Sequence, residues 1–499
     1  MRSFGRREAR PIGRRGAAVR GALALALTLT LACAGRPAED RRRGEEAGPK
    51  DRPAVGGAST HMSEKTGDSG MDPTAQHVAQ DMSGSPAKDG APGAGANGAR
   101  GGRAGRPTGD LLLAAPGAKD MSNQTPLPAP RPMPAGYLGF ARACEPGERI
   151  VVAAVGDLLL HHELQIQATV AKTRFRVLWA GVEDLLGAAD LTYANLEVPL
   201  AAGVLRSGEE VADPGLVFDR KVYTAYPRFN VHPSLALDLV TSGVDVVSTA
   251  NNHALDRGPL GVDKTLAALV AAKLPHTGTR ARTKPGPWHA VTKAGNFTVA
   301  WLACTLHTNR VADEAGQVLR CFDTPTAVAD AVRQLARTPG IDAVIVTPHW
   351  GKEYSPTATA QQTEFARRWA EAGATAIVGS HPHVLQPWET MTTSDGREVL
   401  VAYSLGNFVS HQPELPKRST AIVYFGLGKA ATGPAFVSGA GYVPVHVRQT
   451  GDEFFAEAID RVGGPADSRA HVVANFGAAN LLAADAPIDV TPQCRPPRE

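Results

Sequence analysis

The stretch VDVVSTANNHALDRG, residues 244–258, decides the predicted fold. It begins with a short, β-branched apolar run, which is typical of a buried strand. Gly258 and Pro259 then open a helical pattern, PLGVDKTLAALVAAK. Two asparagines, a histidine and an aspartate stand between the strand and the helix. A strand, a polar turn and a helix in this order predict one unit of an α/β fold.

The same alternation continues on both sides of this unit. Strand patterns such as RIVVAAVGD, FTVAWLACT, IDAVIVTPHWG and ATAIVGSHPHV are separated by helical patterns such as TPTAVADAVRQLAR. The last part, with EVLVAYSLGNFV, STAIVYFGL and GYVPVHVRQ, has the pattern of strands throughout. We therefore predict an α/β fold with largely parallel strands that closes with antiparallel ones, in a globular region beginning near Gly147.

The first quarter of the 499-residue chain does not have a globular composition. Seven arginines between Arg2 and Arg20 precede the apolar run GALALALTLTLA. This run is short for a membrane span, which needs ~20 residues, and predicts an export signal. Cys33 could then be the lipidated cysteine of a bacterial lipoprotein, or the small residues around it could form an ordinary cleavage site. We favour the lipoprotein, because a tether-like segment rich in Gly, Pro and Ala follows at once.

These features predict four segments and a location. The segments are an export signal at 1–33, a disordered linker at 34–145, a globular domain at 146–455 and a C-terminal extension at 456–499. The protein is expected to be exported and held on a membrane by its lipid, facing the periplasm or the cell exterior. Overall 43% of residues are apolar, 20% are charged and the formal net charge is +3, too weak a bias to predict nucleic-acid binding.

The cysteines agree with an oxidising compartment. The chain has five, and four remain if Cys33 carries lipid. Cys304 and Cys321 flank a predicted loop, whereas Cys144 and Cys494 flank the whole globular region. We hypothesise that they pair in this pattern.

Six predicted strands end in residue types that bind metal ions. These endings are Asp157, Asn195 with Glu197, Asn251 with Asn252 and His253, His349, His381 with His383, and Asn407. Because ligands of α/β sheets bind outside the carboxyl ends of the strands, we expect the endings to form one site. In SHPH the two histidines are two residues apart, so in an extended segment fixed by Pro382 both imidazoles point to the same side.

The NNHALD segment allows two interpretations. The carbonyl of Asn252 is a good oxygen ligand, which leaves His253 free to act on a substrate and Asp256 to orient its imidazole. Alternatively, the asparagines and Asp256 satisfy the turn and cap the helix that begins at Pro259.

Taken in order, six motifs resemble the CapA family, named for capsule or poly-γ-glutamate biosynthesis. The motifs are GDLLL, NLE, ANNHALDRG, HWGKEY, GSHPHV and YSLGNF, and they span about residues 150–410. The family is similar to calcineurin-like metallophosphoesterases. The resemblance implies a four-layer α/β/β/α sandwich with a two-metal site between the loops at the strand ends.

The resemblance also implies roles for single residues. Asp157 matches the first metal-binding aspartate, Glu197 stands at the position of the bridging carboxylate, and Asn252 matches the asparagine ligand. His253 matches the histidine that protonates the leaving group. The remaining histidine ligands match His349, His381 and His383. The pattern has a histidine where this chain has Leu159, and His161 is the candidate replacement; the bridging residue is Glu rather than Asp.

Such a mixed nitrogen and oxygen site suits two Mn²⁺, Fe or Zn²⁺ ions, which would activate a hydroxide while His253, oriented by Asp256, acts as general acid. Trp350, Tyr354 and Asn407 are predicted to line the pocket, with packing as the alternative for each. We therefore predict a surface-anchored metal-dependent hydrolase acting in synthesis, release or attachment of an anionic extracellular polymer, with that polymer or its synthase complex as partner. The alternatives are a non-catalytic polymer-binding accessory protein and a general periplasmic phosphoesterase.

Overall fold

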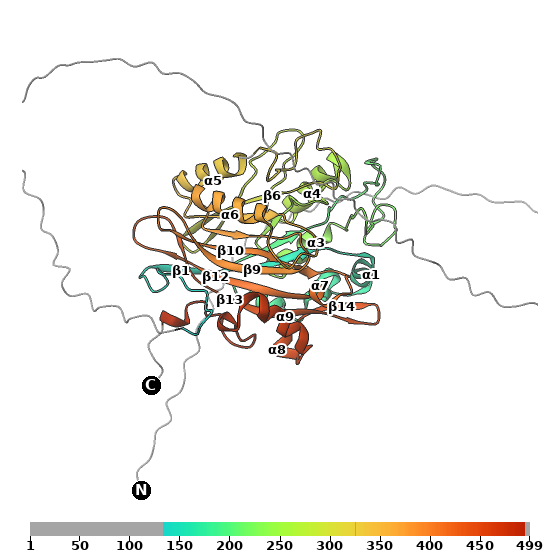
Figure 1. Ribbon diagram of the computed structural model, residues 1–499. Coiled ribbons are helices and arrows are strands. Elements are labelled where there is room, and N and C mark those ends of the chain that lie inside the picture. Colours follow the sequence, from blue (N-terminus) through green and yellow to red (C-terminus); the bar gives the residue numbers. More distant parts are fainter. Residues whose placement is uncertain (1–132, 325, 495–499) are drawn as a thin grey trace, which may run out of the picture. The chain divides into compact units, whose positions relative to one another are not determined.

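The computed structural model describes residues 133–324 and 326–494. Within them two β-sheets are stacked and helices cover the outer faces, as Figure 1 shows for α5 and α6 above β10. The predicted export signal, the lipidation site at Cys33 and most of the predicted linker lie outside the described residues. No helix of the described part is long and apolar enough to cross a membrane.

The first sheet contains the first four strands of the described part of the chain, β11 and the last three strands. Its order is β14-β13-β12-β1-β2-β3-β4, and β11 pairs with the end of β1. The parallel strands are β1 (Glu148–Leu158), β2 (Leu191–Leu196), β3 (Val246–Ser248), β4 (His276–Thr277) and β11 (Asn407–Val409). The antiparallel strands are β12 (Ser419–Lys429), β13 (Phe436–Thr450) and β14 (Glu453–Ala458).

The second sheet has the order β5-β6-β7-β8-β10-β9. Its parallel strands are β6 (Phe297–Thr305), β7 (Ala343–His349), β8 (Ala376–Val378) and β10 (Glu398–Leu405). Its antiparallel edges are β5 (Ala290–Ala294) and β9 (Leu385–Thr392). The largely parallel strands, with antiparallel β12, β13 and β14 last in the chain, agree with the sequence prediction, whereas the antiparallel edges β5 and β9 of the second sheet were not predicted.

Three apolar layers hold the four structural layers together. One lies between the first sheet and α1 (His162–Val170), η1 (Arg174–Trp179), α2 (Glu183–Leu186) and α3 (Ser234–Thr241). The second lies between the sheets, where the rings of Tyr193 and Trp301 stack with centroids 5.6 Å apart. The third packs the second sheet against α5 (Ala327–Arg337) and α6 (Ala360–Ala372). The predicted four-layer α/β/β/α sandwich is confirmed.

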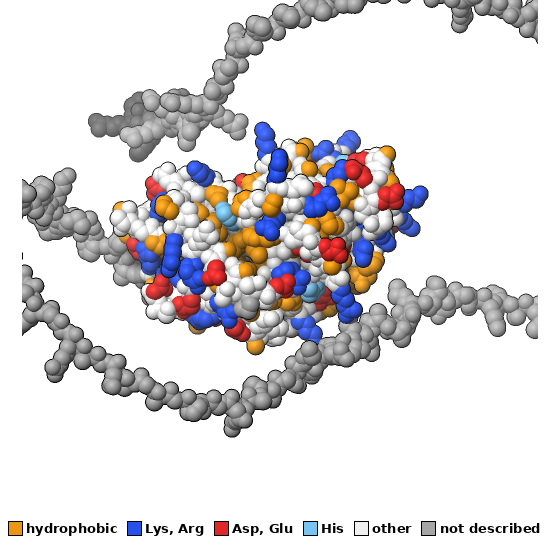
Figure 2. Space-filling view, turned by 90° about the horizontal axis from the view of Figure 1, so that it is seen from above, with side chains coloured by type: hydrophobic (Ala, Val, Ile, Leu, Met, Phe, Trp, Pro, Cys, Tyr) orange, Lys and Arg blue, Asp and Glu red, His pale blue; other side chains and the backbone are white. Residues whose placement is uncertain are grey.

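The remaining helices are α4 (Gly258–Ala271), α7 (Leu415–Arg418), α8 (Ile459–Val462), α9 (Ala466–Phe476), η2 (Ala478–Asn480) and η3 (Pro492–Cys494). Among them, α4 adds Leu269 to the first apolar layer and α9 adds Phe476 to the second. Charge is mixed on the face shown in Figure 2, where Lys and Arg side chains are interspersed with Asp and Glu, as the small net charge implies.

The predicted segment boundaries need two corrections. Phe140 and Ala143 are buried in the layer between the sheets, so the end of the predicted linker at 34–145 belongs to the folded body. The boundary between 455 and 456 falls inside β14, and α9 of the predicted extension contributes Phe476 to the same buried layer. The residues at both ends of the folded body include apolar side chains that are buried. Dividing the chain by its average composition did not detect them.

The two predicted disulfides are both present. Cys144 is bonded to Cys494, across 350 residues of sequence, and ties the start of the folded body to its end. Cys304 is bonded to Cys321 and closes a loop after β6.

Candidate metal centre

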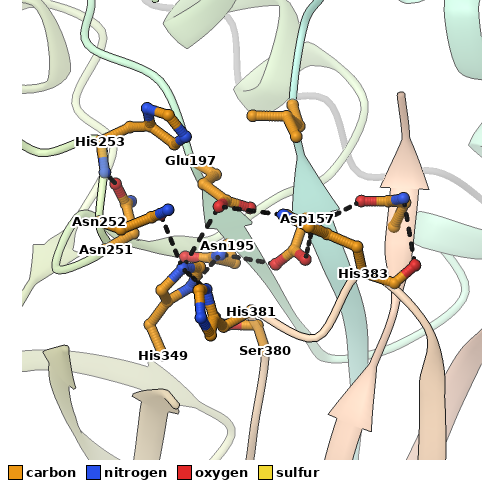
Figure 3. A network of polar contacts seen from close by, with 12 residues as sticks. Asp157, Asn195, Glu197, Asn251, Asn252, His253, His349, Ser380, His381 and His383 are labelled. Atoms are coloured by element: carbon orange, nitrogen blue, oxygen red, sulfur yellow. Dashed lines mark hydrogen bonds and ion pairs between the residues drawn. The ribbon is translucent and has the colours of Figure 1, made fainter. Parts of the chain in front are cut away.

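The polar strand ends meet at one place, between the two sheets. Asp157 on β1 lies in register with Asn195 on β2 and with Asn407 on β11. Glu197 follows β2 directly, and His349 is the last residue of β7. Figure 3 shows how side chains from both sheets converge on Glu197.

Two groups of possible metal ligands share this carboxylate. The first group is Glu197, His349 and His381, and the second is Asp157, Glu197 and His383. Within each group the ligand atoms lie within 4.8 Å of one another, and all five residues are buried. A carboxylate common to two groups is the arrangement expected for two ions that share a bridging ligand.

In the first group, several nitrogen and oxygen atoms lie within 3.3 Å of His349 Nε2. His349 Nε2 lies 3.3 Å from Glu197 Oε1, 3.0 Å from His381 Nδ1 and 3.0 Å from the Asn252 carbonyl oxygen. Asn252 therefore joins the first group as a fourth possible ligand. All four atoms can bind a cation, and an amide oxygen does so without adding charge.

The second group is held by hydrogen bonds around His383. His383 Nδ1 lies 3.0 Å from Asp157 Oδ2 and 3.0 Å from the Asn407 side-chain oxygen, and its Nε2 faces Glu197 Oε1 at 3.9 Å. Asn195, whose amide donates to Asp157 Oδ1 at 2.8 Å, also lies 3.2 Å from His349 Nδ1. Asn195 thereby links the two groups.

The electrostatics of Glu197 fit a divalent cation. Its side chain is fully buried, and neither carboxylate oxygen accepts a hydrogen bond from any described residue, although His349 Nε2 is within ion-pair distance. Burial, followed by the nearby Asp157, raises the pKa of Glu197 well above its usual range. A buried carboxylate without partners costs several kcal/mol, which a bound cation offsets.

Two of the buried histidines favour the neutral form, which is the form that binds metals. Burial, and then the neighbouring imidazoles, lowers the pKa of His349 and of His381 well below the usual range. Neutral imidazole has the free nitrogen lone pair that a cation requires. The donor set therefore fits one or two divalent ions.

The SHPH segment reaches this geometry differently from the prediction. His381 and His383 have φ of 103° and 59°, so the segment is not extended. Such left-handed conformations cost on the order of 1–3 kcal/mol each and persist only where the surroundings enforce them. Here the Ser380 amide donates to Pro348 O at 3.0 Å, and the Tyr354 amide donates to Pro382 O at 2.8 Å. Both imidazoles still reach the ligand groups.

With this geometry established, the match to known proteins decides the family. Residues 151–412 match the family of bacterial capsule synthesis proteins called PGA_cap, which is more than half of the chain. The chain belongs to this family. All five ligand candidates, His253 and Asn252 lie inside the matched region.

Curated relatives of this PGA_cap protein are named for capsule and polymer synthesis. It is 25% identical over 328 residues to the capsule biosynthesis protein CapA of Bacillus anthracis, covering 63% of this chain and 71% of that protein. It is 31% identical over 195 residues to the PGA biosynthesis protein CapA of Bacillus subtilis, covering 38% of this chain and 48% of that protein. A probable polyglutamine synthesis accessory protein of Mycobacterium tuberculosis is 28% identical over 213 residues, 40% of this chain and 52% of that protein. A role in capsule synthesis follows at the level of the family.

Solved structures similar to this PGA_cap protein are more distant. The NAD nucleotidase of Haemophilus influenzae aligns with a TM-score of 0.38 at 12% identity, covering 67% of this chain and 57% of that chain. A putative 5′-nucleotidase from Staphylococcus aureus aligns with a TM-score of 0.37 at 14% identity, covering 60% and 55%. At these scores the chemistry of the site is argued from its own geometry.

The structure distinguishes the two interpretations of the NNHALD segment. The Asp256 carboxylate lies 2.8 Å from His253 Nδ1 and accepts the Phe229 amide at 2.6 Å. Helix α4 follows Arg257, and no side chain caps it. Asn251 satisfies the turn, because its oxygen accepts the His253 amide and its nitrogen donates to Leu196 O. Asp256 therefore orients His253, and Asn251 has the turn role.

Two residues that support His253 were not predicted from the sequence. The Phe229 ring lies edge-on to His253, with centroids 4.8 Å apart. Arg257 is fully buried, and its guanidinium donates to the carbonyls of Val204, Val222 and Asp256. Burial lowers the pKa of Arg257 to about 10, so the side chain keeps its charge at neutral pH. The only sequence signal was an arginine beside a functional aspartate.

His161 lies outside both ligand groups. Its Nδ1 is 3.1 Å from Leu159 O and accepts the His411 amide at 3.2 Å. Its ring instead lies edge-on to those of Phe229 and His411, with centroids 5.3 and 6.3 Å away. The structure thus does not bring the predicted replacement ligand to the centre.

The three predicted pocket residues have different surroundings. Trp350 is fully buried in the layer under α6, where it stacks on Trp369 and donates to Tyr403 O at 2.9 Å, so it is a core residue rather than a pocket wall. Asn407 is buried and holds His383. Only Tyr354 is exposed, at 48%, with its ring centroid 6.0 Å from that of His383. Tyr354 alone is placed to meet a substrate.

Proposed function

We propose that this PGA_cap protein is a metal-dependent hydrolase that cuts or transfers an anionic extracellular polymer during capsule synthesis. The observation that carries the proposal is the shared Glu197 between two ligand groups with the His253–Asp256 pair beside them. An oriented imidazole beside a buried, unpartnered carboxylate is what a general acid next to a metal site requires. Names of the relatives supply the class of polymer, poly-γ-glutamate or a similar capsule chain.

The two ligand groups would hold two divalent ions. Glu197, His349, His381 and Asn252 would bind one, and Asp157, Glu197 and His383 the other. Mn²⁺, Fe or Zn²⁺ would suit these donors. When bound, such ions lower the pKa of a water molecule and stabilise negative charge on the leaving group.

The residues of the chain would then supply orientation and a proton. Because Asp256 lies against Nδ1 of His253, the other ring nitrogen, Nε2, is left to carry a proton to a leaving oxygen or nitrogen. The Phe229 ring restricts rotation of this imidazole. Tyr354, the exposed aromatic residue beside His383, would contact the substrate; its ring centroid lies 3.8 Å from the Lys417 ammonium, which is itself paired with Glu414 at 3.0 Å.

The location belongs to the same proposal. An export signal with lipid on Cys33 and a linker after it would place the site outside the cytoplasm, where capsule polymer is assembled. Both disulfides of the described residues suit an oxidising compartment. The partner would be the polymer itself or the complex that makes it.

The test combines metal analysis with a substrate panel of a chromogenic phosphodiester, a chromogenic γ-glutamyl amide and poly-γ-glutamate. We expect His253→Gln to lower turnover by at least about 100-fold while keeping its metal. His381→Ala and His383→Ala should lose metal and turnover together. His289→Gln, next to the edge strand β5, is the matched control and should change neither.

Other outcomes separate the alternatives. Full turnover by His253→Gln contradicts the assigned proton donor. A wild-type chain that binds metal and polymer without cutting anything in the panel is an accessory protein. Turnover of the phosphodiester alone indicates a general phosphoesterase.

A further inference from the structure

A disulfide-closed loop lies over the first ligand group. This loop, residues 305–320, runs from the end of β6 to Cys321, and the Cys304–Cys321 bond closes its base. Both cysteines are buried. Backbone hydrogen bonds reinforce the closure, because the Thr305 amide donates to Leu319 O and the Cys321 amide to Thr305 O, each at 2.9 Å.

The loop touches three of the four ligands of that group. The Asn252 side-chain nitrogen donates to the Asn309 side-chain oxygen at 3.3 Å. The His307 ring lies edge-on to His381, with centroids 5.2 Å apart. The Leu306 amide donates to the carbonyl of His349 at 2.8 Å. One covalently closed loop thus supports Asn252, His381 and His349 together.

The Asn309 contact decides which end of the Asn252 amide faces the ligand group. With its nitrogen bound to Asn309, Asn252 directs its oxygen to within 3.0 Å of His349 Nε2. A reversed amide would present two N–H groups, which repel a cation and cannot bind it. The hydrogen bond to Asn309 therefore favours the amide orientation that can bind a metal.

The loop is held in a conformation that it would not adopt freely. Asn309 and Arg310, two consecutive residues, have φ of 47° and 61°. Asn tolerates this left-handed region, but Arg does so less readily. The Thr308 hydroxyl donates to Val311 O at 2.7 Å and the Val311 amide returns to Thr308 O at 2.8 Å, closing a tight turn around the two residues. Strain that is enforced beside a ligand group points to a positioning role.

We propose that Asn309 is a positioning residue for Asn252, and that the Cys304–Cys321 disulfide maintains the metal affinity of the first group by holding the 305–320 loop in place. This inference rests on the proposed metal centre. It assigns the disulfide to the site rather than to stability of the fold alone. In the part of the chain that the structure describes, the loop's hydrogen bonds and ring contacts reach Asn252, His349 and His381 rather than Asp157 or His383, so the second group should be less affected.

The experiment measures Mn²⁺ affinity of the full chain by calorimetry. Asn309→Gly deletes the side chain while glycine accepts the positive φ without strain, and Asn309→Asp keeps an acceptor oxygen. We expect the Gly variant to bind one of the two ions about 10-fold more weakly, as loss of a residue that orients a ligand typically does. The Asp variant should bind as tightly as wild type or more tightly.

The disulfides provide a matched pair of controls. Cys304→Ser with Cys321→Ser should weaken Mn²⁺ binding at least as much as Asn309→Gly. Cys144→Ser with Cys494→Ser removes the longer closure and should lower stability, yet leave the Mn²⁺ affinity within about twofold of wild type.

Three results would overturn the inference. Unchanged affinity in Asn309→Gly beside tight wild-type binding contradicts it and leaves the metal centre standing. Equal losses in both disulfide variants assign the effect to global stability. A wild-type chain that binds no Mn²⁺ overturns the proposed function, and this inference with it.

Discussion

Replacing Glu197 by Gln should stabilise the metal-free protein and remove most of the stabilisation that metal gives. Glu197→Gln keeps the shape of the side chain and removes its charge. Without metal, the wild-type chain has a buried carboxylate whose two oxygens accept no hydrogen bond from the described residues. Removing that charge should stabilise the metal-free protein, whereas with metal the same change removes a ligand from both groups.

The pH dependence of the free energy of unfolding sets the size of the stabilisation expected for Glu197→Gln. Because burial and Asp157 raise the pKa of Glu197, the folded chain holds this proton more tightly than the unfolded chain, whose Glu pKa is about 4.3. Wild-type stability therefore falls as pH rises above about 4.3, by at most about 1.4 kcal/mol per pH unit, until the raised pKa is passed. The advantage of the Gln variant should thus grow with pH in the absence of metal.

With metal the advantage of the Gln variant should shrink by the free energy of metal binding that only the wild type gains. Mn²⁺ at 100 times its dissociation constant would stabilise the wild type by about 2.7 kcal/mol, and the Gln variant should gain little. The assay is urea unfolding followed by tryptophan fluorescence at pH 6 and pH 8, with EDTA or with Mn²⁺. A Gln variant that is less stable than wild type in EDTA at pH 8, or that gains as much from Mn²⁺, would refute the reasoning.

Three further substitutions test other parts of the site. Asp256→Asn should lower turnover by at least about 100-fold with metal content unchanged, because a neutral amide can turn its N–H₂ to Nδ1 of His253 and lacks the negative charge that favours the proton-donating form of the ring. Full turnover in a steady-state assay would contradict this role. Arg257→Met should lower the free energy of unfolding by about 3 kcal/mol, because it removes the guanidinium donor from the carbonyls of Val204 and Asp256, whereas Val222 O keeps the Asn230 side-chain donor at 2.9 Å. Thermal unfolding checks this, and a loss below about 1 kcal/mol would count against it. Trp350→Phe should lower the free energy of unfolding by about 1–2 kcal/mol, because Tyr403 O loses the indole donor. Metal content and KM should stay as in wild type, and a raised KM would place Trp350 at the substrate.

The strand endings could be predicted because parallel strands deliver their carboxyl ends to one place. Asp157, Glu197, His349 and His381 follow apolar runs that have the length and composition of buried strands. Their convergence follows from sheet topology, which the alternation of strands and helices already implied. The family resemblance added the roles of individual ligands.

The supporting residues could not be predicted, because their contacts join segments with no regular pattern. Phe229 lies between β2 and α3, in a stretch without strand or helix periodicity, yet its amide reaches Asp256. Asn309 acquires its partner only through the closed loop. Trp350 is next to His349, but successive side chains of an extended chain point to opposite sides, so this indole enters the core under α6.

Anomalous diffraction from crystals loaded with Mn²⁺ tests the central claim most directly. The proposed centre predicts two peaks about 3.5–4 Å apart, with Glu197 touching both. One peak should lie against His349, His381 and Asn252, and the other against Asp157 and His383. A single peak away from Glu197, or no peak at saturating Mn²⁺, would contradict a shared two-metal centre.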